Sequence, residues 1–129
     1  MQVRRKKMNY LIINEQHNLF LQQENILKNF GEVKIVKVPA AGWTLEKLKN
    51  FEVDNKLQSR DTVIFASPIP FLIKELTSIL VWLNNPDMSG DNVGLKYNVL
   101  VFHNDKRDKL ELPNGKIINR VSAEGWMLV

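Results

Sequence analysis

The order of apolar and polar positions along the chain predicts strands and helices in alternation. Four short runs rich in β-branched and aromatic residues indicate strands, at 10–13, 33–38, 62–66 and 97–102. Three intervening segments carry apolar residues every three or four positions and indicate helices, at 19–30, 44–51 and 69–83. A chain that alternates in this way forms a mostly parallel sheet with helices on both faces, joined by right-handed crossovers.

Residues at the segment ends agree with this assignment. Gly31 suits the position after a helix, where positive φ is common, and Thr44 suits the N-cap of the second helix. The third helix has the strongest pattern, an apolar stripe at helical spacing that consists of Ile69, Leu72, Ile73, Leu76, Ile79, Leu80 and Leu83. We therefore expect one continuous helix up to Leu83. Val81 and Trp82, in its last turn, are either core residues or a dimer contact.

The last third of the chain carries a hairpin signal. Asn114-Gly115 lies between the apolar residues of 110–112 and those of 117–118. Asn-Gly is typical of the type I′ turn, in which both central residues have positive φ. We expect this hairpin to extend the sheet, and the tail 121–129 to pack back on the sheet. The predicted fold class is α/β, a mostly parallel sheet flanked by helices that ends in a C-terminal β-hairpin.

Length and composition restrict the class of protein. A chain of 129 residues with 44% hydrophobic content predicts one domain with a real core. No segment approaches the ~18 apolar residues of a membrane span, and the run 8–14 is too short and too mixed for a signal peptide. The chain has no cysteine, which excludes disulfides and thiolate metal sites. We therefore expect a cytoplasmic protein without a membrane partner.

The positive charge is confined to one end of the chain. Arg4, Arg5, Lys6 and Lys7 carry the net charge of +4, and the remainder holds 14 basic and 14 acidic residues. We expect residues 1–7 to form a flexible basic arm and residues 8–129 to form a single domain. This arm is a disordered segment before the domain, an extension from a translation start upstream of a domain that begins at Met8, or a contact for a polyanion. The neutral body argues against double-stranded nucleic acid as a partner.

Polar side chains follow the first, third and fourth predicted strands. Ligands of open parallel sheets bind outside the carboxyl ends of the strands, which makes these residues the candidate site. The candidates after the first strand are Asn14, Glu15, Gln16 and His17. Those after the third and fourth strands are Ser67, His103, Asn104, Lys106 and Arg107. Both histidines fall at strand ends, and the alternative for each is a polar loop residue satisfied by the backbone.

The turn Ser67-Pro68-Ile69-Pro70 stands where nucleotide-binding folds usually carry glycines. We expect Ser67 at the N-cap of the third helix and Pro68 at its first position. A phosphate at a helix N-terminus is held by several backbone N–H groups, and the two prolines remove two of them. The predicted ligand contacts of Ser67, Pro68 and Ile69 therefore suit one phosphate or a ribose, not a triphosphate.

Common catalytic signatures are absent from the sequence. It contains no GxGxxG, GxxxxGK[ST] or GxSxG motif and no His and carboxylate cluster with metal spacing, so we expect neither a cofactor nor a metal. Metal-free cleavage of an RNA phosphodiester uses the ribose 2′-OH as nucleophile and needs a general base such as His17 or His103. Ser67, Lys106 or Arg107 suits the role of stabilising the phosphate. The alternative is that these are ordinary solvated residues.

Three stretches together resemble the small Rossmann-like accessory proteins of type III CRISPR systems. They read NYLIINEQHNLFLQQENILKNFGEVKIVKVP, VIFASPIPFLIKEL and YNVLVFHNDKRDKLELPNGKIINRVSAEGW, and span residues 9–39, 63–76 and 97–126. The likeness is one of layout and turn chemistry, from Met8 to about Trp126. It implies a homodimer that binds cyclic oligoadenylate, the second messenger of this antiviral defence, across the dimer and over the strand ends.

The resemblance leaves open whether the ligand is cleaved. Some members of the family are metal-independent ring nucleases and others only sequester the ring. The matching positions are the turn Asn14 to His17, the turn Ser67 to Pro70, and the exit of the fourth strand at His103 and Asn104, followed by Lys106 and Arg107. No single catalytic residue is matched, so ring nuclease and non-catalytic sponge are both retained. A third hypothesis, favoured by the neutral body, is an α/β interaction module that binds no nucleotide.

Overall fold

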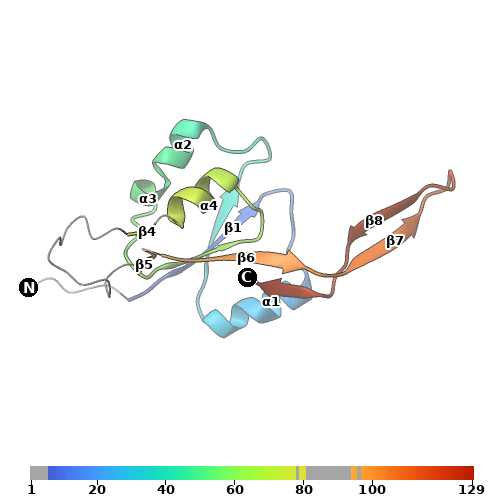
Figure 1. Ribbon diagram of the computed structural model, residues 1–129, viewed down its shortest axis with the longest axis horizontal. Helices are drawn as coiled ribbons and strands as arrows, with labels where there is room; N and C mark the ends of the chain where they lie inside the picture. The colour runs from blue at the N-terminus through green and yellow to red at the C-terminus, as the bar shows by residue number, and fades with distance from the viewer. Residues whose placement is uncertain (1–5, 78, 81–93, 96) are drawn as a thin grey trace, which may run out of the picture.

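The computed structural model describes residues 6–77, 79–80, 94–95 and 97–129 and confirms the α/β class. Five strands form the main sheet, in the order β2-β1-β3-β6-β9 (Figure 1). Their bounds are β1 Asn9–Asn14, β2 Lys34–Val38, β3 Thr62–Phe65, β6 Asn98–Asn104 and β9 Trp126–Leu128. The first four are parallel, and β9 is antiparallel to β6. The sheet is therefore mostly parallel, as the alternating pattern predicts.

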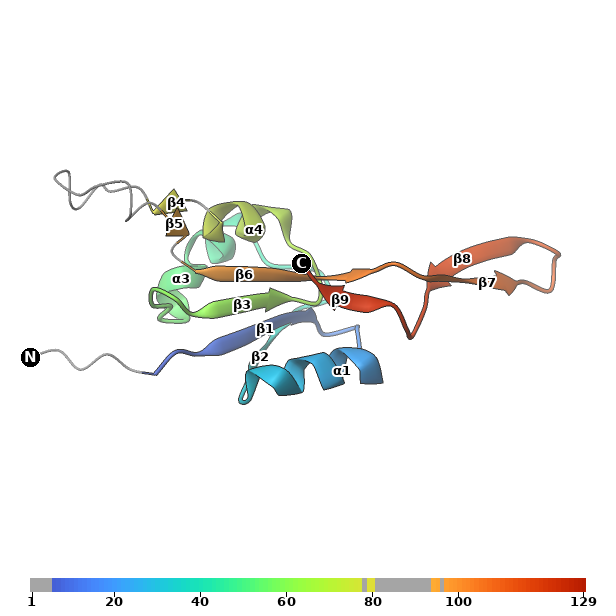
Figure 2. The same ribbon diagram turned by 60° about the horizontal axis from the view of Figure 1, so that its bottom comes forward.

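Helices cover both faces of this sheet. Their bounds are α1 Leu21–Leu27, the 3₁₀ helix η1 Lys28–Phe30, α2 Leu45–Lys49, α3 Phe51–Asp54 and α4 Pro70–Leu76. Figure 2 shows α1 on one side of the sheet, and α3 and α4 on the other. Gly31 ends η1 with φ +76°, and the Thr44 hydroxyl accepts a hydrogen bond from Lys47 N at 3.2 Å. Both predicted helix ends are thus confirmed.

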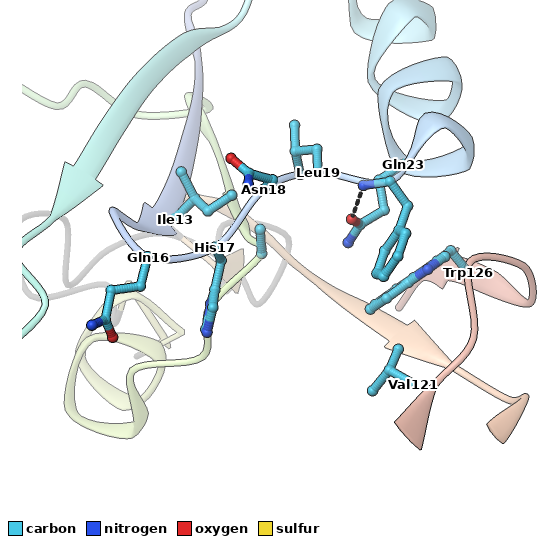
Figure 3. Close-up of a pocket in the computed structure, with 10 residues that line it drawn as sticks. Ile13, Gln16, His17, Asn18, Leu19, Gln23, Val121 and Trp126 are labelled. Carbon is cyan, nitrogen blue, oxygen red and sulfur yellow. Dashed lines mark hydrogen bonds between the residues drawn. The ribbon is translucent and has the colours of Figure 1, made fainter. Parts of the chain in front are cut away.

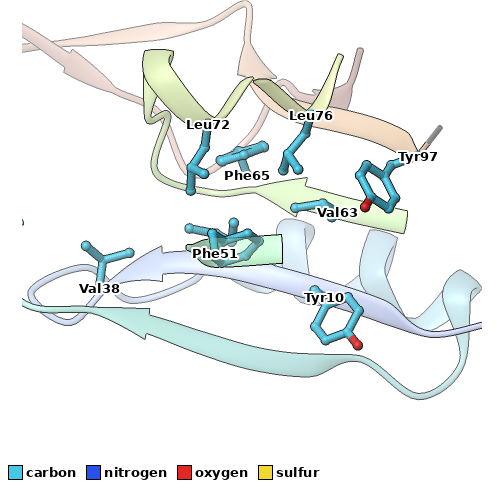
Figure 4. Packing of buried hydrophobic residues seen from close by; sticks show 9 residues of the cluster. Tyr10, Val38, Phe51, Val63, Phe65, Leu72, Leu76 and Tyr97 are labelled. Carbon is cyan, nitrogen blue, oxygen red and sulfur yellow. The ribbon is translucent and has the colours of Figure 1, made fainter. Parts of the chain in front are cut away.

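The alternation of side chains along β1 divides the core into two halves. Tyr10 and Ile12 belong to the half of the core that also contains Phe51 of α3 and Leu72 of α4 (Figure 4). The larger half consists of Tyr10, Ile12, Val38, Phe51, Val63, Phe65, Leu72, Leu76 and Tyr97. The half under α1 consists of Leu11, Ile13, Leu27, Ile64 and Phe102. Because both faces of the central strands are buried, β1 and β3 read as continuous apolar runs. None of the described helices is long and apolar enough to cross a membrane.

Helix α4 is shorter than its apolar stripe predicts. It starts at Pro70, with Ile69 rather than Ser67 at the N-cap, because a residue that precedes proline is driven into extended backbone. It ends after Leu76, and the predicted continuation to Leu83 is wrong at Ile79–Leu80. These residues form strand β4, antiparallel to β5 at Gly94–Leu95. The predicted helical positions Val81, Trp82 and Leu83 lie outside the described residues.

The predicted hairpin is present, but it does not extend the main sheet. β7 Arg107–Glu111 and β8 Ile117–Val121 form a separate two-stranded sheet that projects from the body (Figures 1 and 2). The antiparallel strand that the sheet gains is β9, from the tail around Trp126. The turn also differs from type I′. Gly115 has φ +83° but Asn114 does not have positive φ, because Pro113 fixes the backbone of a type I turn ahead of the glycine.

Candidate functional site

The hydroxyl of Ser67 lies at the centre of the candidate site. It follows β3 and accepts a hydrogen bond from Asn14 N, at the end of β1, at 2.9 Å. Nδ1 of His17 lies 2.9 Å from the same oxygen. Ser67 is buried, with 9% of its surface exposed, whereas His17 is exposed. The parallel pairing of β1 and β3 places both strand ends at one edge of the sheet, so the predicted proximity of these turns is found.

The hydrogen bond between His17 and Ser67 is compatible with two tautomers. When the imidazole proton is on Nε2, the Ser67 hydroxyl donates to Nδ1 while it accepts from Asn14 N. When the proton is on Nδ1, that N–H donates to Ser67 and leaves Nε2 as an unprotonated base. In either case the buried serine fixes the orientation of the ring. Nε2 is therefore a hydrogen-bond donor in the first tautomer and a base in the second.

Asn14 and Glu15 shape the loop that carries His17. The Asn14 side chain accepts a hydrogen bond from Gln16 N at 2.9 Å, and Asn14 O accepts one from His17 N at 2.9 Å. The Glu15 carboxylate accepts a hydrogen bond from Ala40 N at 2.8 Å. These two predicted ligand contacts thus have local structural partners, while Gln16 lines the pocket described next.

A pocket of about 400 Å³ opens beside His17. Figure 3 shows Gln16 and His17 on one side of it and Trp126 and Val121 on the other. The lining residues are Ile13, Gln16, His17, Asn18, Leu19, Phe20, Gln23, Ala66, Val121 and Trp126. The rings of Phe20 and Trp126 are stacked with centroids 5.7 Å apart. We call this pocket the aromatic pocket. Its size lies within the range of small-molecule sites.

A second pocket of about 260 Å³ lies beside Ser67. It is lined by Asn14, Val38, Gly42, Trp43, Leu48, Ser67, Pro68 and Ile69. The Trp43 ring packs against Phe51, with centroids 5.7 Å apart. Because His17 lines the aromatic pocket and Ser67 lines this one, the hydrogen-bonded pair connects the two. Each pocket thus combines an indole ring with polar groups from the strand ends.

The exit of β6 forms a separate group of predicted residues. Asn104 is buried, and its side-chain amide donates to Ser122 O at 3.3 Å and to Glu124 O at 2.7 Å. Its side-chain oxygen accepts from Lys106 N at 2.9 Å and Arg107 Nη1 at 2.8 Å. These contacts fasten the base of the hairpin. Asn104 and Arg107, predicted as ligand contacts, are thus engaged in holding this corner of the chain.

His103 and Lys106 are exposed at the same corner. His103 Nε2 lies 2.9 Å from Asp105 Oδ1, and Lys106 Nζ lies 3.7 Å from Glu124 Oε2. The contacts of the described residues join His17 to Ser67 and His103 to Asp105, and none joins the two histidines. The structure therefore brings together the turns after β1 and β3. Asn104 and Arg107, at the exit of β6, are paired with Trp126 and Val121, which line the aromatic pocket.

The stacked rings of Phe20 and Trp126, which we call the aromatic wall, were not predicted from the sequence. Phe20 precedes α1 and Trp126 opens β9, and Trp126 N donates to Gln22 Oε1 at 2.7 Å across 104 positions. No local pattern announces such a contact. The sequence signal that points to this contact is the tail 121–129, which contains Trp126 and is expected to pack back on the sheet.

A third pocket, of about 400 Å³, lies at the opposite edge of the sheet. Asn9 and Lys34, the first residues of β1 and β2, line it together with Lys6 and Lys7. It is more basic than the aromatic pocket but lies at the amino ends of the strands, away from the Ser67 turn. Its three lysines, Lys6, Lys7 and Lys34, offer contacts for an anion, and Glu32 also lines the pocket.

No three His, Cys, Asp or Glu side chains in the described part of the chain are grouped closely enough to hold a metal ion. Comparison with family models, curated proteins and solved structures finds no match to this chain.

Proposed function

We propose that this protein binds a cyclic oligoadenylate at the carboxyl edge of its sheet. The observation that carries the proposal is the hydrogen-bonded His17–Ser67 pair between two indole-lined pockets. The resemblance of the chain to type III CRISPR accessory proteins supports the same ligand. By this proposal the protein acts in the cytoplasm, in antiviral defence, as a homodimer.

The chemistry of the two pockets suits adenine nucleotides. Bases stack on aromatic side chains, with about 1–3 kcal/mol for each base, and Trp126 and Trp43 line separate pockets. Gln16 and Asn18 supply amide groups for the edge of a base. A cyclic oligonucleotide carries one charge for each linkage, so it does not require the glycine-rich cradle of a triphosphate. A nearly neutral site with a few donors is compatible with such a ligand.

Cleavage of the ring would use His17. In this step the ribose 2′-OH attacks the adjacent phosphorus, its proton moves to Nε2, and the bond from phosphorus to the 5′ oxygen breaks. The leaving 5′ oxygen takes a proton from water, His17 releases the proton it accepted to the solvent, and the products are a 2′,3′-cyclic phosphate and a 5′-OH. Ser67 acts as a positioning residue that orients the imidazole. His103, which pairs with Asp105 at the hairpin base, is assigned no part in this step.

The alternative function is an interaction module that binds no nucleotide. Two observations favour it, the neutral charge of the body and the apolar residues exposed on the hairpin, such as Ile117 and Val121. The interaction module predicts a protein partner, and it predicts neither binding nor cleavage of any oligoadenylate. The two functions are therefore separable by one ligand experiment.

The test is incubation of the pure protein with labelled cyclic tetra-adenylate in EDTA, with a gel shift and product chromatography read from the same tube. His17→Ala is compared with His103→Ala, because both remove an exposed imidazole. We expect a shift for the wild-type protein that weakens at least about tenfold in His17→Ala, roughly 1.4 kcal/mol, and is retained in His103→Ala.

Each outcome of this incubation has one meaning. Linear products that disappear in His17→Ala identify a metal-independent ring nuclease, and a shift with intact ligand identifies a sponge. Products that persist in both variants contradict the role given to His17. If neither a shift nor a product is seen at micromolar protein, the result contradicts cyclic-oligoadenylate binding and favours the interaction module.

A further inference from the structure

The hairpin of β7 and β8 stands apart from the rest of the fold. All five residues of each strand are exposed, and the extensive contacts of the two strands are with each other. In both views the hairpin projects away from the main sheet (Figures 1 and 2). A two-stranded hairpin on its own is marginally stable in water, and further strands stabilise it.

The two edges of the hairpin differ in chemistry. β7 reads RDKLE and carries four charged residues, whereas β8 reads IINRV and carries one. The apolar residues of β8 are exposed: Ile117 to 65%, Ile118 to 41% and Val121 to 40%. Charged side chains are a common protection of edge strands against pairing. β7 has this protection and β8 lacks it.

The hydrogen bonds at the ends of the hairpin show which backbone groups face outward. Leu112 N donates to Lys116 O at 2.7 Å, and Ser122 N donates to Lys106 O at 3.3 Å. Hydrogen-bonded and non-hydrogen-bonded pairs alternate along an antiparallel ladder, so the even-numbered residues of β8 bond to β7. The residues of β8 whose N–H and C=O groups point to the open edge are Ile117, Asn119 and Val121.

We propose that β8 pairs with β8 of a second copy of this chain, antiparallel and about a twofold axis at Asn119. This register sets Asn119 against the partner's Asn119, and Ile117 against the partner's Val121. All outward-facing groups are then paired, in about six backbone hydrogen bonds. Both Ile–Val pairs remove exposed apolar surface from water. The product is a four-stranded ribbon with the two globular bodies at its opposite ends.

Charge selects this register over its neighbours. An axis at Ile118 would place Lys116 opposite the partner's Arg120, and an axis at Arg120 would place that residue opposite itself. Like charges directly opposite one another destabilise an antiparallel pair. With the axis at Asn119, Arg120 lies opposite the partner's Ile118 and no like charges meet within the strand. The open edge is thus complementary to itself, which identifies a second copy as its partner.

The pairing would add a residue to the candidate site. Val121 lines the aromatic pocket, and the partner's Ile117 would lie beside it, because opposed residues of a ladder share one face. Val121 of each copy therefore faces the same side of the ribbon, and the aromatic pockets of both copies lie on that side. The inference deepens the homodimer of the proposed function and rests on that function only for the ligand. Its test contains no nucleotide, so the two can fail separately.

The first test compares two proline substitutions by sedimentation equilibrium without ligand. Asn119→Pro removes an outward N–H, and Lys109→Pro removes the outward N–H of the residue directly opposite in β7. Neither costs the hairpin a ladder hydrogen bond. The chain mass is 15.0 kDa. We expect twice this mass for the wild-type protein and for Lys109→Pro, and the single-chain mass for Asn119→Pro.

The second test uses a single introduced thiol, because the chain has no cysteine of its own. At the axis the Cα atoms of Asn119 in the two copies lie about 5.5 Å apart, within reach of a disulfide. Those of Lys109 lie about 14 Å apart, three strand spacings. We expect mild oxidation to give a covalent dimer with Asn119→Cys and none with Lys109→Cys.

Two results would overturn this inference. One is a wild-type protein that is monomeric at tens of micromolar. The other is a dimer that persists in Asn119→Pro while Asn119→Cys forms no disulfide, because another surface then holds the copies together. If the proline variant does not fold, the pair of cysteine variants decides the question alone.

Discussion

One buried hydroxyl determines the geometry of the candidate site. Ser67 is held by Asn14 N and by His17, each at 2.9 Å, and the extended backbone before Pro70 keeps it out of the helix. The two prolines that distinguish this turn from a glycine-rich loop therefore place Ser67 between the strand ends. Its role is to orient the imidazole, not to cap α4.

A second buried hydroxyl, that of Tyr97, links stability to alkaline pH. Tyr97 is 2% exposed, and its hydroxyl donates to Glu52 Oε2 at 3.3 Å. Burial, and after it the carboxylates of Glu52 and Asp61, raise the pKa of Tyr97 far above its usual value of 10.0. The raised pKa means that folding favours the neutral phenol, so this stabilisation is complete below pH 10 and falls as the pH rises above 10.

Tyr97→Phe tests this linkage. At pH 7 we expect the free energy of unfolding to fall by about 1 kcal/mol, for one lost hydrogen bond. Between pH 10 and 11.5 the variant should lose stability less steeply than the wild-type protein, as measured by urea unfolding at each pH. Parallel curves for the two proteins would show that Tyr97 does not carry the effect.

At the scale of elements, Asn104 fastens the hairpin to the sheet. Four of its hydrogen bonds connect the end of β6 to 106–107 and to 122–124. Asn104→Ala removes all four of these hydrogen bonds, although Ser122 O still accepts one from Trp126 Nε1 at 3.1 Å. We expect a loss of about 2 kcal/mol in the free energy of unfolding, measured in urea.

Lys106→Ala is the matched control at this corner. It removes an exposed ion pair with Glu124 that spans 3.7 Å, and such pairs contribute at most about 1 kcal/mol. An Asn104→Ala variant as stable as Lys106→Ala would contradict the structural role of the amide and restore Asn104 as a candidate for ligand contact.

The elements that the sequence predicts well are those with a regular period and a clear end. Continuous apolar runs identify β1 and β3, and Gly31 and Thr44 mark helix ends. The end of α4 is missed because the apolar spacing continues past Leu76, although Thr77 closes the helix and its hydroxyl donates to Ile73 O. Helical spacing alone does not separate a helix from a helix followed by a short strand.

At the scale of the whole molecule, the site combines a predictable half with an unpredictable one. The topology rule for parallel sheets places His17 and Ser67 together from the sequence alone. The aromatic wall depends on Trp126, which reaches α1 through a contact with Gln22 across 104 positions. It also depends on β9 joining the sheet in place of the hairpin. Neither feature has a local signature, because both depend on the tertiary path of the chain after β6.

The central claim is that a cyclic oligoadenylate binds between the strand ends and the aromatic wall. Backbone amide NMR spectra of the labelled protein, recorded during titration with cyclic tetra-adenylate in EDTA, locate a ligand directly. We predict shifts at three segments that line the two pockets, 14–20, 66–69 and 121–126, and unchanged amides at 30–32, beside the basic pocket. Shifts confined to 30–34 and the basic arm, or no shifts at millimolar ligand, would contradict it.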